Sequence, residues 1–427
     1  MKQPFNNIKK VSGELSLPGD KSISHRALIF SAMASGSSTI ENLSDGLDVS
    51  ATLNCLKHLG ADISISKEQT KVRGCGFKGF KKPDLPLNCN NSGTTARLLS
   101  GLLIAQKFNS ILTGDDSLSK RPMRRIIEPL ERMGGRIHDS NNTLPLVIHP
   151  SDQLNAINYP LKIPSAQVKS AVLIAALHIE DETIITEKSI TRDHTERMLG
   201  LDVQTSGNKV ISKSSYKNYP QPNNYFIPGD ISSASFLIVA ALLTKSSELI
   251  IKNVSLNPTR TGIIQLLKKM GAKIHTVSKM ESCNESYGDL MVSSSQLKNV
   301  FIGEDIIPSI IDEIPILSIA GLFAEGRFEI RNCQELRVKE SDRINSICYN
   351  LKLAGLTVEE YEDGFSFAGR LKNEAIIYES FGDHRIAMAF AVLSILNKNG
   401  GAVNAFECVN ISNPGFLKQL HSVCEYS

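Results

Sequence analysis

Basic residues stand where helices are predicted to begin, a position at which a positive charge is locally unfavourable. A helix N-terminus already carries roughly half a positive charge. A cation at that place is therefore best explained by an anion bound there. Five cations share the predicted position: Lys21, Arg121, Arg192, Arg343 and Arg385. One such residue would be interpreted as a solvated surface charge, but five at comparable positions favour a site for ligands with several phosphate or carboxylate groups.

Two further segments contain residues suited to acid–base chemistry. Asp312 stands at the mouth of a predicted buried helix, and Lys339, Glu340 and Arg343 follow one another within about one helical turn. A carboxylate among cations stays ionised and can act as a base, whereas one against apolar walls can keep a proton. The alternative for Lys339–Arg343 is a helix face with ion pairs three and four residues apart, and spacing alone leaves that alternative open.

The segment Leu17–Leu28, Leu-Pro-Gly-Asp-Lys-Ser-Ile-Ser-His-Arg-Ala-Leu, has a partial copy half a chain later. The copy, Pro228–Leu237, keeps the Pro-Gly-Asp, a serine two residues after the aspartate and the apolar run, but it carries no cation. The serines and aspartates of both copies are also ordinary helix caps. A duplicated helix start, charged in one half only, predicts two similar domains that enclose one anion site.

A second pattern, Leu-x-x-apolar-Gly-x-x-(Ile/Val), recurs about every 65 to 85 residues. Its glycines are Gly60, Gly134, Gly200, Gly271 and Gly355, and the copy at Gly200 has the polar Glu196 in place of the first Leu. Each copy predicts a helix that ends at the glycine and is followed by a strand. The helix predicted over 416–423 would be the sixth copy, cut short by the chain end.

Between these copies lie segments rich in Ala, Leu and Ile on nearly every face, which predicts buried helices. They cover residues 96–105, 167–177, 235–243, 314–324 and 384–396. Six units, each with one buried helix, one amphipathic helix and short strands, predict a repetitive α/β fold with three units per domain. The alternative is a doubly wound parallel sheet, which the absence of a Gly-x-Gly-x-x-Gly turn disfavours.

The chain of 427 residues is too long for one core. We expect one domain over 20–229 and a discontinuous one over 1–19 and 230–427, with crossings at the two Pro-Gly-Asp turns. A net charge of +3 argues against a nucleic-acid or membrane partner. Eight cysteines without Cys-x-x-Cys pairing, and no signal peptide or membrane span, predict a reduced cytoplasmic protein. No His/Cys cluster has metal-ligand spacing, so no metal is expected.

Six motifs occur in order along the chain, and the match to which they belong runs from Lys21 to Pro414. They are Leu-Pro-Gly-Asp-Lys-Ser-Ile-Ser-His-Arg, Asn-Ser-Gly-Thr-Thr-Ala-Arg, Lys-Arg-Pro-Met, Ser-Ala-Gln-Val-Lys-Ser-Ala, Leu-Arg-Val-Lys-Glu-Ser-Asp-Arg-Ile and Gly-Asp-His-Arg-Ile-Ala-Met. As a set they closely resemble the 5-enolpyruvylshikimate-3-phosphate (EPSP) synthase family. The resemblance implies an inside-out α/β barrel of two domains, each with three βαβαββ units, and helix N-termini that face the space between the domains.

The activity implied by the resemblance is transfer of the enolpyruvyl group of phosphoenolpyruvate to the 5-hydroxyl of shikimate 3-phosphate, with release of phosphate. Addition and elimination proceed through a tetrahedral intermediate without metal or cofactor. The pathway implied is the shikimate pathway to chorismate and the aromatic amino acids. Because the two expected domains form a self-contained clamp, we expect a monomer, and the cysteines and the N-terminus predict the cytoplasm. The family is the target of glyphosate, although room beside Gly93 does not by itself decide sensitivity.

The resemblance also assigns roles to individual residues. For shikimate 3-phosphate it implies Lys21, Ser22, Arg26, Ser165, Ala166, Gln167, Arg192, Asp312 and Lys339. For phosphoenolpyruvate it implies Lys21, Gly93, Arg121, Gln167, Arg343, His384 and Arg385. Asp312 would be the base for the 5-hydroxyl, and Glu340 together with Lys21 would protonate the methylene carbon.

Three positions depart from the family pattern. Ala166 stands where many members have a serine, Ile411 where some have a lysine, and Glu335 where some have an asparagine. Ala166 removes one hydroxyl contact, and Ile411 leaves a cation on the phosphoenolpyruvate side in doubt.

Three alternatives share the architecture. A UDP-N-acetylglucosamine enolpyruvyl transferase would need a cysteine in the loop Gly114–Pro122, which has none. An RNA 3′-phosphate cyclase would need a nucleotide site and a basic RNA path. A non-catalytic anion-binding relative is disfavoured because Lys21, Asp312, Glu340 and Arg385 are all present.

Overall fold

The computed structural model describes residues 1–66, 68–207 and 209–427. Contacts within the chain divide it into two units. Unit 1 contains residues 1–18, 228–280 and 286–427, and unit 2 contains residues 19–227 and 281–285. The chain changes unit beside the two Pro-Gly-Asp turns, and residues 281–285, expected in the discontinuous domain, group with unit 2. We propose that each unit is one domain.

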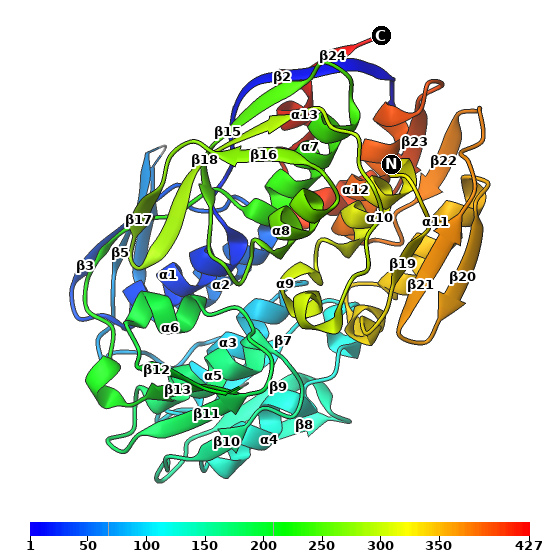
Figure 1. The fold of residues 1–427 in the computed structure, drawn as a ribbon. Helices are drawn as coiled ribbons and strands as arrows, with labels where there is room; N and C mark the ends of the chain where they lie inside the picture. The colour runs from blue at the N-terminus through cyan, green and yellow to red at the C-terminus, as the bar shows by residue number, and fades with distance from the viewer. Residues whose placement is uncertain (67, 208) are drawn as a thin grey trace. The chain divides into compact units, whose positions relative to one another are not determined.

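Unit 2 is built from three βαβαββ repeats, each with a four-stranded sheet (Figure 1). The first contains α1 (Lys21–Met33), β3 (Ser37–Glu41), α2 (Leu47–His58), β4 (Asp62–Ile65), β5 (Gln69–Arg73) and, from the end of the unit, β14 (Asn224–Phe226). The second contains β6 (Leu87–Asn88), α3 (Gly93–Leu103), β7 (Ser110–Thr113), η1 (Leu118–Lys120), α4 (Arg124–Arg132), β8 (Arg136–Ser140) and β9 (Thr143–His149). The third contains β10 (Asn158–Pro160), α5 (Ala166–Ala176), β11 (Thr183–Glu187), α6 (His194–Leu199), β12 (Val203–Ser206) and β13 (Lys209–Ser214), and η2 (Tyr216–Asn218) follows it. Each sheet of unit 2 has one parallel pair of neighbouring strands: β14 with β3, β6 with β7, and β10 with β11. The other neighbouring strands of these sheets pair antiparallel.

Unit 1 follows the same plan with variations at the chain ends. Its first repeat contains β2 (Ile8–Ser16), α7 (Ile231–Leu243), β15 (Glu248–Ser255), α8 (Gly262–Lys269), β16 (Lys273–Thr276), β17 (Met280–Ser282) and β18 (Glu285–Ser293). The second contains η3 (Glu304–Ile306), α9 (Ile307–Ile310), α10 (Ile314–Phe323), β19 (Phe328–Ile330), η4 (Gln334–Val338), α11 (Arg343–Leu353), β20 (Thr357–Tyr361) and β21 (Gly364–Ala368). The third contains β22 (Ile376–Glu379), α12 (His384–Leu396), β23 (Gly401–Asn404), η5 (Phe406–Ile411), α13 (Phe416–Val423) and β24 (Cys424–Tyr426).

The chain ends complete this third repeat in an unusual way. β1 (Gln3–Phe5) pairs with β23, whereas β24 leaves its own repeat and pairs antiparallel with β2. The second repeat has a single parallel bridge, Lys298 to Glu325, where the other repeats have a first strand. The short separate sheets exclude the doubly wound parallel sheet and confirm the repetitive α/β fold.

The predicted helix ends are confirmed by the backbone. The glycines of the recurring pattern all have positive φ: Gly60 (101°), Gly134 (96°), Gly200 (60°), Gly271 (100°) and Gly355 (92°). A residue without a Cβ adopts this conformation readily, so the glycine ends the helix and turns the chain into a strand. β4, β8, β12, β16 and β20 follow these turns.

The helices predicted to be apolar on all sides are the cores of the units. α1, α3 and α5 are buried along nearly their whole length in unit 2, as are α7, α10 and α12 in unit 1. In unit 1 each of these three helices contacts the other two, and in unit 2 α3 contacts both neighbours. In each unit the sheets lie outside the buried helices (Figure 1).

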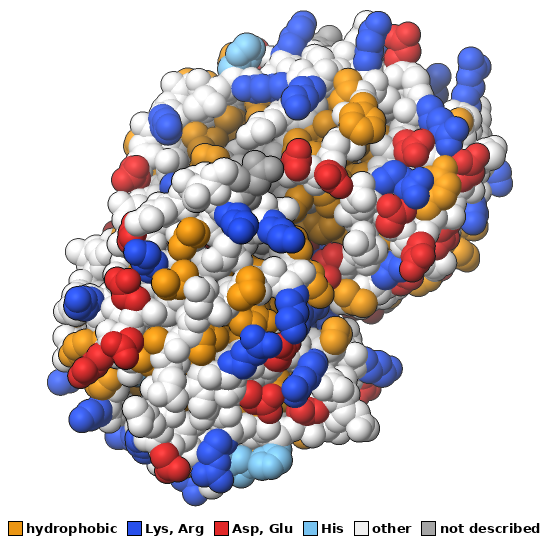
Figure 2. Space-filling model, turned by 60° about the horizontal axis from the view of Figure 1, so that its bottom comes forward, with side chains coloured by type: hydrophobic (Ala, Val, Ile, Leu, Met, Phe, Trp, Pro, Cys, Tyr) orange, Lys and Arg blue, Asp and Glu red, His pale blue; other side chains and the backbone are white. Residues whose placement is uncertain are grey.

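The surface agrees with the small net charge. Figure 2 shows basic and acidic side chains interspersed over one face of the molecule. Within the described chain, no single helix has the length and apolar composition of a membrane span. Two successive helical segments, Glu304–Ile310 and Ile314–Phe323, have that length and composition only when they are counted together, and a sharp bend separates them.

Candidate active site

The first Pro-Gly-Asp copy caps α1 and places a lysine at its start. The Asp20 carboxylate accepts a hydrogen bond of 3.0 Å from the backbone N–H of Ile23. Lys21 is the first residue of the helix, and its Nζ lies 2.9 Å from Oδ2 of Asp48, in the first turn of α2. The ammonium is therefore held at the helix N-terminus by a carboxylate of the neighbouring helix.

Arg26 lies one turn further along α1 and is bound by the protein itself. Its Nε donates to Thr195 Oγ1 (2.7 Å), and its two Nη atoms donate to the Ser22 carbonyl (2.8 Å) and to Ser170 Oγ (2.5 Å). A guanidinium has five N–H donors, so two remain for a ligand. The pKa of Arg26 is lowered to about 10, chiefly by burial and to a smaller extent by the nearby Arg192, against the opposing effect of acidic neighbours such as Glu196. Both arginines predicted to hold shikimate 3-phosphate therefore lie within electrostatic range of each other.

A second cluster surrounds the start of α3. A Cβ built on Gly93 would lie 2.7 Å from Nη1 of Arg97 and 3.5 Å from Nη1 of Arg121. Arg97 donates a hydrogen bond of 2.5 Å to Oε1 of Gln167, whose amide nitrogen donates to Thr94 Oγ1 at 3.0 Å. The predicted residues Gly93, Arg121 and Gln167 thus lie together, and Arg97 joins them.

Sequence reasoning missed Arg97 as a site residue. The signal was present, because Arg97 closes the Asn-Ser-Gly-Thr-Thr-Ala-Arg motif one turn after Gly93. Arg97 is 5% exposed, and it donates a hydrogen bond to Gln167, which is predicted to bind phosphoenolpyruvate.

The start of α5 and the loop before α6 supply further predicted residues of unit 2. Ser165 is the N-cap, and its Oγ accepts from the backbone N–H of Val168 at 3.4 Å, so its own proton remains available to a ligand. Ala166 opens the helix and offers no hydroxyl. Arg192 follows Thr191, whose N–H and hydroxyl both donate to the buried Glu187. A carboxylate thus anchors the segment that carries Arg192.

In unit 1, the guanidinium of Arg343 donates hydrogen bonds to three carboxylates. Its Nε donates to Asp383 Oδ2 (2.8 Å), Nη1 to Asp312 Oδ1 (3.2 Å) and Nη2 to Glu340 Oε2 (2.6 Å). Burial acts to lower the pKa of Arg343, but the carboxylates, Asp383 first and then Glu340 and Asp312, raise it well above its usual range. Arg343 is 1% exposed. The ion pair expected three residues apart exists, but in a buried cluster and not on an exposed helix face.

The other predicted residues of unit 1 lie around this cluster. Lys339 is half-buried just after η4; burial and the nearby Arg343 lower its pKa, while Asp312 opposes the shift. His384 and Arg385 open α12, and the backbone N–H of Arg385 donates to the cap Asp383 at 2.8 Å. Asp383 was not assigned a role from the sequence, although the Gly-Asp-His-Arg motif contains it.

The expectation that five cations begin helices is right for three of them. Lys21 and Arg343 are the first residues of α1 and α11, and Arg385 is the second of α12. Arg121 precedes α4 by three residues and is extended (φ −77°, ψ 141°), because the following Pro122 disfavours the helical region. Arg192 lies two residues before α6. These two arginines reach their positions from loops.

The two units therefore carry different chemistry. The unit 2 group is mostly cationic and contains Lys21, Arg26, Gly93, Arg97, Arg121, Gln167 and Arg192. The unit 1 group holds both predicted acid–base carboxylates and contains Asp312, Lys339, Glu340, Arg343, Asp383, His384 and Arg385. In the described residues, no group of three or more His, Cys, Asp or Glu side chains is placed to hold a metal ion.

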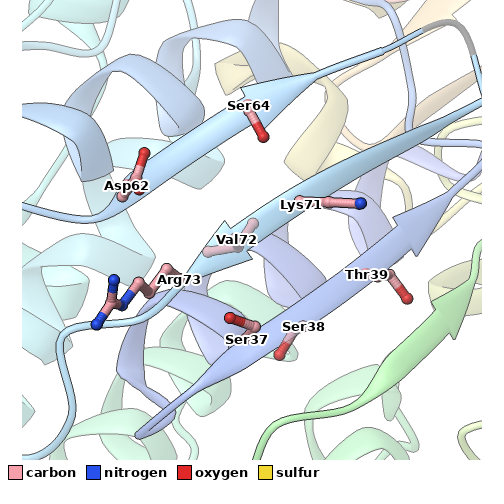
Figure 3. Close-up of a pocket in the computed structure, with 8 residues that line it drawn as sticks. All are labelled: Ser37, Ser38, Thr39, Asp62, Ser64, Lys71, Val72 and Arg73. Atoms are coloured by element: carbon pink, nitrogen blue, oxygen red, sulfur yellow. The ribbon is translucent and has the colours of Figure 1, made fainter.

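A shallow hollow of about 440 Å³ lies elsewhere in unit 2, on the sheet of β3, β5 and β4 (Figure 3). Its charged residues are Asp62, Lys71 and Arg73, and Asp62 stands opposite Arg73 in the strand register. None of the predicted site residues lines this hollow. The group around α1, α3 and α5 in unit 2 and the group around α11 and α12 in unit 1 contain the motif residues, and each is a better candidate for substrate binding than this hollow.

Comparison with known proteins decides the family. The family model for EPSP synthase (3-phosphoshikimate 1-carboxyvinyltransferase) matches residues 5–420. The chain belongs to the EPSP synthase family. It is 47% identical to a 3-phosphoshikimate 1-carboxyvinyltransferase of Petrotoga mobilis and 44% identical to one of Thermoanaerobacter sp., over 98% and 96% of both proteins. The chain is therefore an enzyme, a transferase of aromatic amino acid biosynthesis through the shikimate pathway.

Solved structures agree. An EPSP synthase from Acinetobacter baumannii is 39% identical, with a TM-score of 0.87 over all of this chain and 98% of that one. The enolpyruvyl transferase NikO from Streptomyces tendae has a TM-score of 0.79 at 15% identity and shows likeness of fold alone. The family membership disfavours the UDP-sugar transferase and the RNA cyclase as interpretations of this chain.

Proposed function

We propose that the protein transfers the 1-carboxyvinyl group of phosphoenolpyruvate to the 5-hydroxyl of shikimate 3-phosphate. The observation that carries the proposal is the position of Arg343, which binds the carboxylates of Asp312 and Glu340 at the same time. These are the two side chains to which the reaction assigns its proton transfers. Family membership supports the substrates, and the cations of the unit 2 group suit their phosphate and carboxylate groups.

In the addition step, Asp312 takes the proton of the 5-hydroxyl while the hydroxyl oxygen attacks C2 of phosphoenolpyruvate. The hydrogen bond from Arg343 keeps Asp312 ionised, which is the form that accepts a proton. The methylene carbon C3 becomes a methyl group by taking a proton. The ammonium of Lys21 carries a proton that it can donate to C3. Glu340 must first take up a proton before it can donate one, because its contact with Arg343 favours the ionised carboxylate.

The elimination step reverses the proton transfer at C3. A proton leaves the methyl group, the C2–C3 double bond forms again, and the C2–O bond to phosphate breaks. Ionised Glu340 is suited to accept that proton. Arg121, Arg97 and Arg385 are the cations that would stabilise the departing phosphate and the carboxylate of the donor.

The test is phosphate release with phosphoenolpyruvate and shikimate 3-phosphate, each alone and both together, in the presence of EDTA. Release with both substrates only, unaffected by the chelator, is the expected result. Absence of release from folded protein that still binds shikimate 3-phosphate would contradict the proposal and direct attention to Ala166 and Ile411.

The proposal includes a monomeric protein in the cytoplasm. All eight cysteines are free thiols, which suits a reducing compartment. Light scattering coupled to size-exclusion chromatography would test the monomer, since a mass of twice 46.7 kDa would contradict it.

A further inference from the structure

The second Pro-Gly-Asp copy has no cation of its own, yet the fold of unit 1 brings one to it. Asp230 caps α7 and accepts from the backbone N–H groups of Ser232 (2.7 Å) and Ser233 (3.4 Å). The hydroxyl of Ser232 is in direct contact with the guanidinium of Arg385 at the start of α12. The helix start that looks uncharged in the sequence therefore receives an arginine predicted to bind phosphoenolpyruvate.

The hydrogen-bond directions around Ser232 are determined by its partners. Arginine can only donate, so Ser232 Oγ must accept from Nη1 of Arg385. Its own single proton then goes to Oε1 of Glu313, which it also contacts. The result is a directed chain from Arg385 through Ser232 to Glu313.

The hydrogen bonds that link Arg385, Ser232 and Glu313 are buried, and further charged residues contact Glu313. Ser232 is 2% exposed and Glu313 is not exposed at all. Arg260 approaches Glu313 Oε1 at 3.7 Å and Asp230 at 3.9 Å, so the carboxylate has a cationic neighbour besides Arg385, whose Nη1 lies 3.6 Å away. A buried hydrogen bond to a charged group is among the stronger ones and holds its donor in one orientation.

These contacts use only one edge of the Arg385 guanidinium. Nη1 donates to Ser232 and to the Asp312 carbonyl at 3.0 Å. Within the described chain, no hydrogen bond joins Nε or Nη2 to an acceptor, and Asp312 Oδ2 lies 3.8 Å from Nη2. The unused N–H groups form the edge that can bind the planar carboxylate or the phosphate of a ligand in a bidentate manner.

We propose that Ser232, itself oriented by Glu313, is a positioning residue that sets the guanidinium of Arg385 for phosphoenolpyruvate. The proposal rests on the proposed function, because it takes phosphoenolpyruvate as the ligand of Arg385. Ser232 acts on the binding of the donor substrate and has no role in that of shikimate 3-phosphate.

The test compares Ser232→Ala with Ser233→Ala in steady-state kinetics of the full-length protein. Ser233 is the next residue of the same helix, and in the described chain its hydroxyl makes no hydrogen bond. We expect Ser232→Ala to raise the KM for phosphoenolpyruvate about tenfold, the effect of one lost hydrogen bond to a charged group. The KM for shikimate 3-phosphate should change less than about twofold, and Ser233→Ala should match the wild type.

A double-mutant cycle separates positioning from a general structural effect. In an Arg385→Lys background, Ser232→Ala should add little to the KM for phosphoenolpyruvate, because the guanidinium that Ser232 orients is gone. An equal increase in both backgrounds, an unchanged KM in the single variant, or equal increases for both substrates with a lower Tm would each overturn the proposal. Wild-type turnover is measured first: its failure contradicts the proposed function and with it the positioning role, whereas normal turnover with an unaffected Ser232→Ala contradicts the positioning role alone.

Discussion

The guanidinium of Arg343 donates a hydrogen bond of 3.2 Å to the carboxylate of Asp312. The two residues are 31 positions apart in the chain, and the same guanidinium also binds Glu340 and Asp383. A cation in this position favours the charged form of a carboxylate, and the hydrogen bond holds the Asp312 side chain in one orientation. Both effects suit the general-base role that we propose for Asp312.

Asp312→Asn should fold and bind both substrates but turn over at least about a hundredfold more slowly, the usual scale for a general base. The amide keeps the size of the side chain and can still accept from Arg343, but it cannot take the proton of the 5-hydroxyl. Single-turnover rates would measure the effect. Asp305→Asn, at an exposed position in η3, is the control and should leave the rate unchanged. Near-normal turnover of Asp312→Asn would remove the assigned role.

Gly93→Ala should weaken binding of the donor substrate. The new methyl group would lie 2.7 Å from Nη1 of Arg97, which cannot withdraw freely because it is bound to Gln167 at 2.5 Å. We expect the KM for phosphoenolpyruvate to rise about tenfold, which corresponds to about 1.4 kcal/mol, with little change for shikimate 3-phosphate. Gly303→Ala is the matched control, because its methyl group would meet only an ordinary contact of 3.8 Å. Equal KM values for Gly93→Ala and wild type would show that the Arg97 side chain moves without cost.

Lys169→Met should destabilise unit 2. Nζ of Lys169 lies 2.7 Å from Glu187 and 2.7 Å from Glu196, and all three side chains are buried. Removing the cation leaves two buried carboxylates without their partner, which costs roughly 3–5 kcal/mol of unfolding free energy. Urea denaturation would measure the loss, with the exposed Lys217→Met as a control expected within about 0.5 kcal/mol of wild type. A loss as small as that of the control would mean that the two carboxylates take up protons in place of the ammonium.

The stability of unit 2 should fall between neutral and acidic pH because of His178. The ring stacks on Phe77, with centroids 5.4 Å apart, and meets the edge of Tyr219 at 5.6 Å. Burial lowers the pKa of His178 from 6.5 to about 4. Because the unfolded chain binds the proton more tightly, the free energy of unfolding decreases as pH falls from about 6.5 towards about 4, by at most about 3 kcal/mol.

His178→Phe should flatten this part of the pH profile, since the variant has no proton to bind there. Thermal unfolding at a series of pH values between 4 and 7 would show the slope. His275→Phe, at an exposed position, should keep the wild-type slope. Identical slopes in wild type and His178→Phe would assign the acid sensitivity to other groups.

Much of the fold could be predicted from the sequence because its determinants are local. A glycine with positive φ ends a helix wherever it occurs, so Gly60 and its four counterparts marked the helix–strand turns correctly. The helices α10 and α12 are apolar on nearly every face, and their burial followed from composition alone. The six motifs also indicated the family, because their residues and their order can be recognised along the chain itself, and the comparisons confirmed it.

Prediction from the sequence was wrong or incomplete for charged residues whose positions depend on parts of the chain far away. It placed Arg121 at a helix start, whereas Pro122 keeps it extended in a turn. The second Pro-Gly-Asp copy has no cation in the sequence, although Arg385, 153 residues after Ser232, contacts that serine. The prediction assigned no role to Arg97, whose contact with Gln167 joins α3 and α5.

The sequence by itself therefore determined the repeat, the buried helices, the family and the residue types of the candidate site. The tertiary structure alone decided which cation faces which carboxylate, as in the group of Asp312, Glu340 and Asp383 around Arg343. The physical reason is that caps and helix ends depend on neighbours a few residues away. The strength of an ion pair depends instead on a separation of a few ångströms and on exclusion of water, and both arise only when distant helices pack.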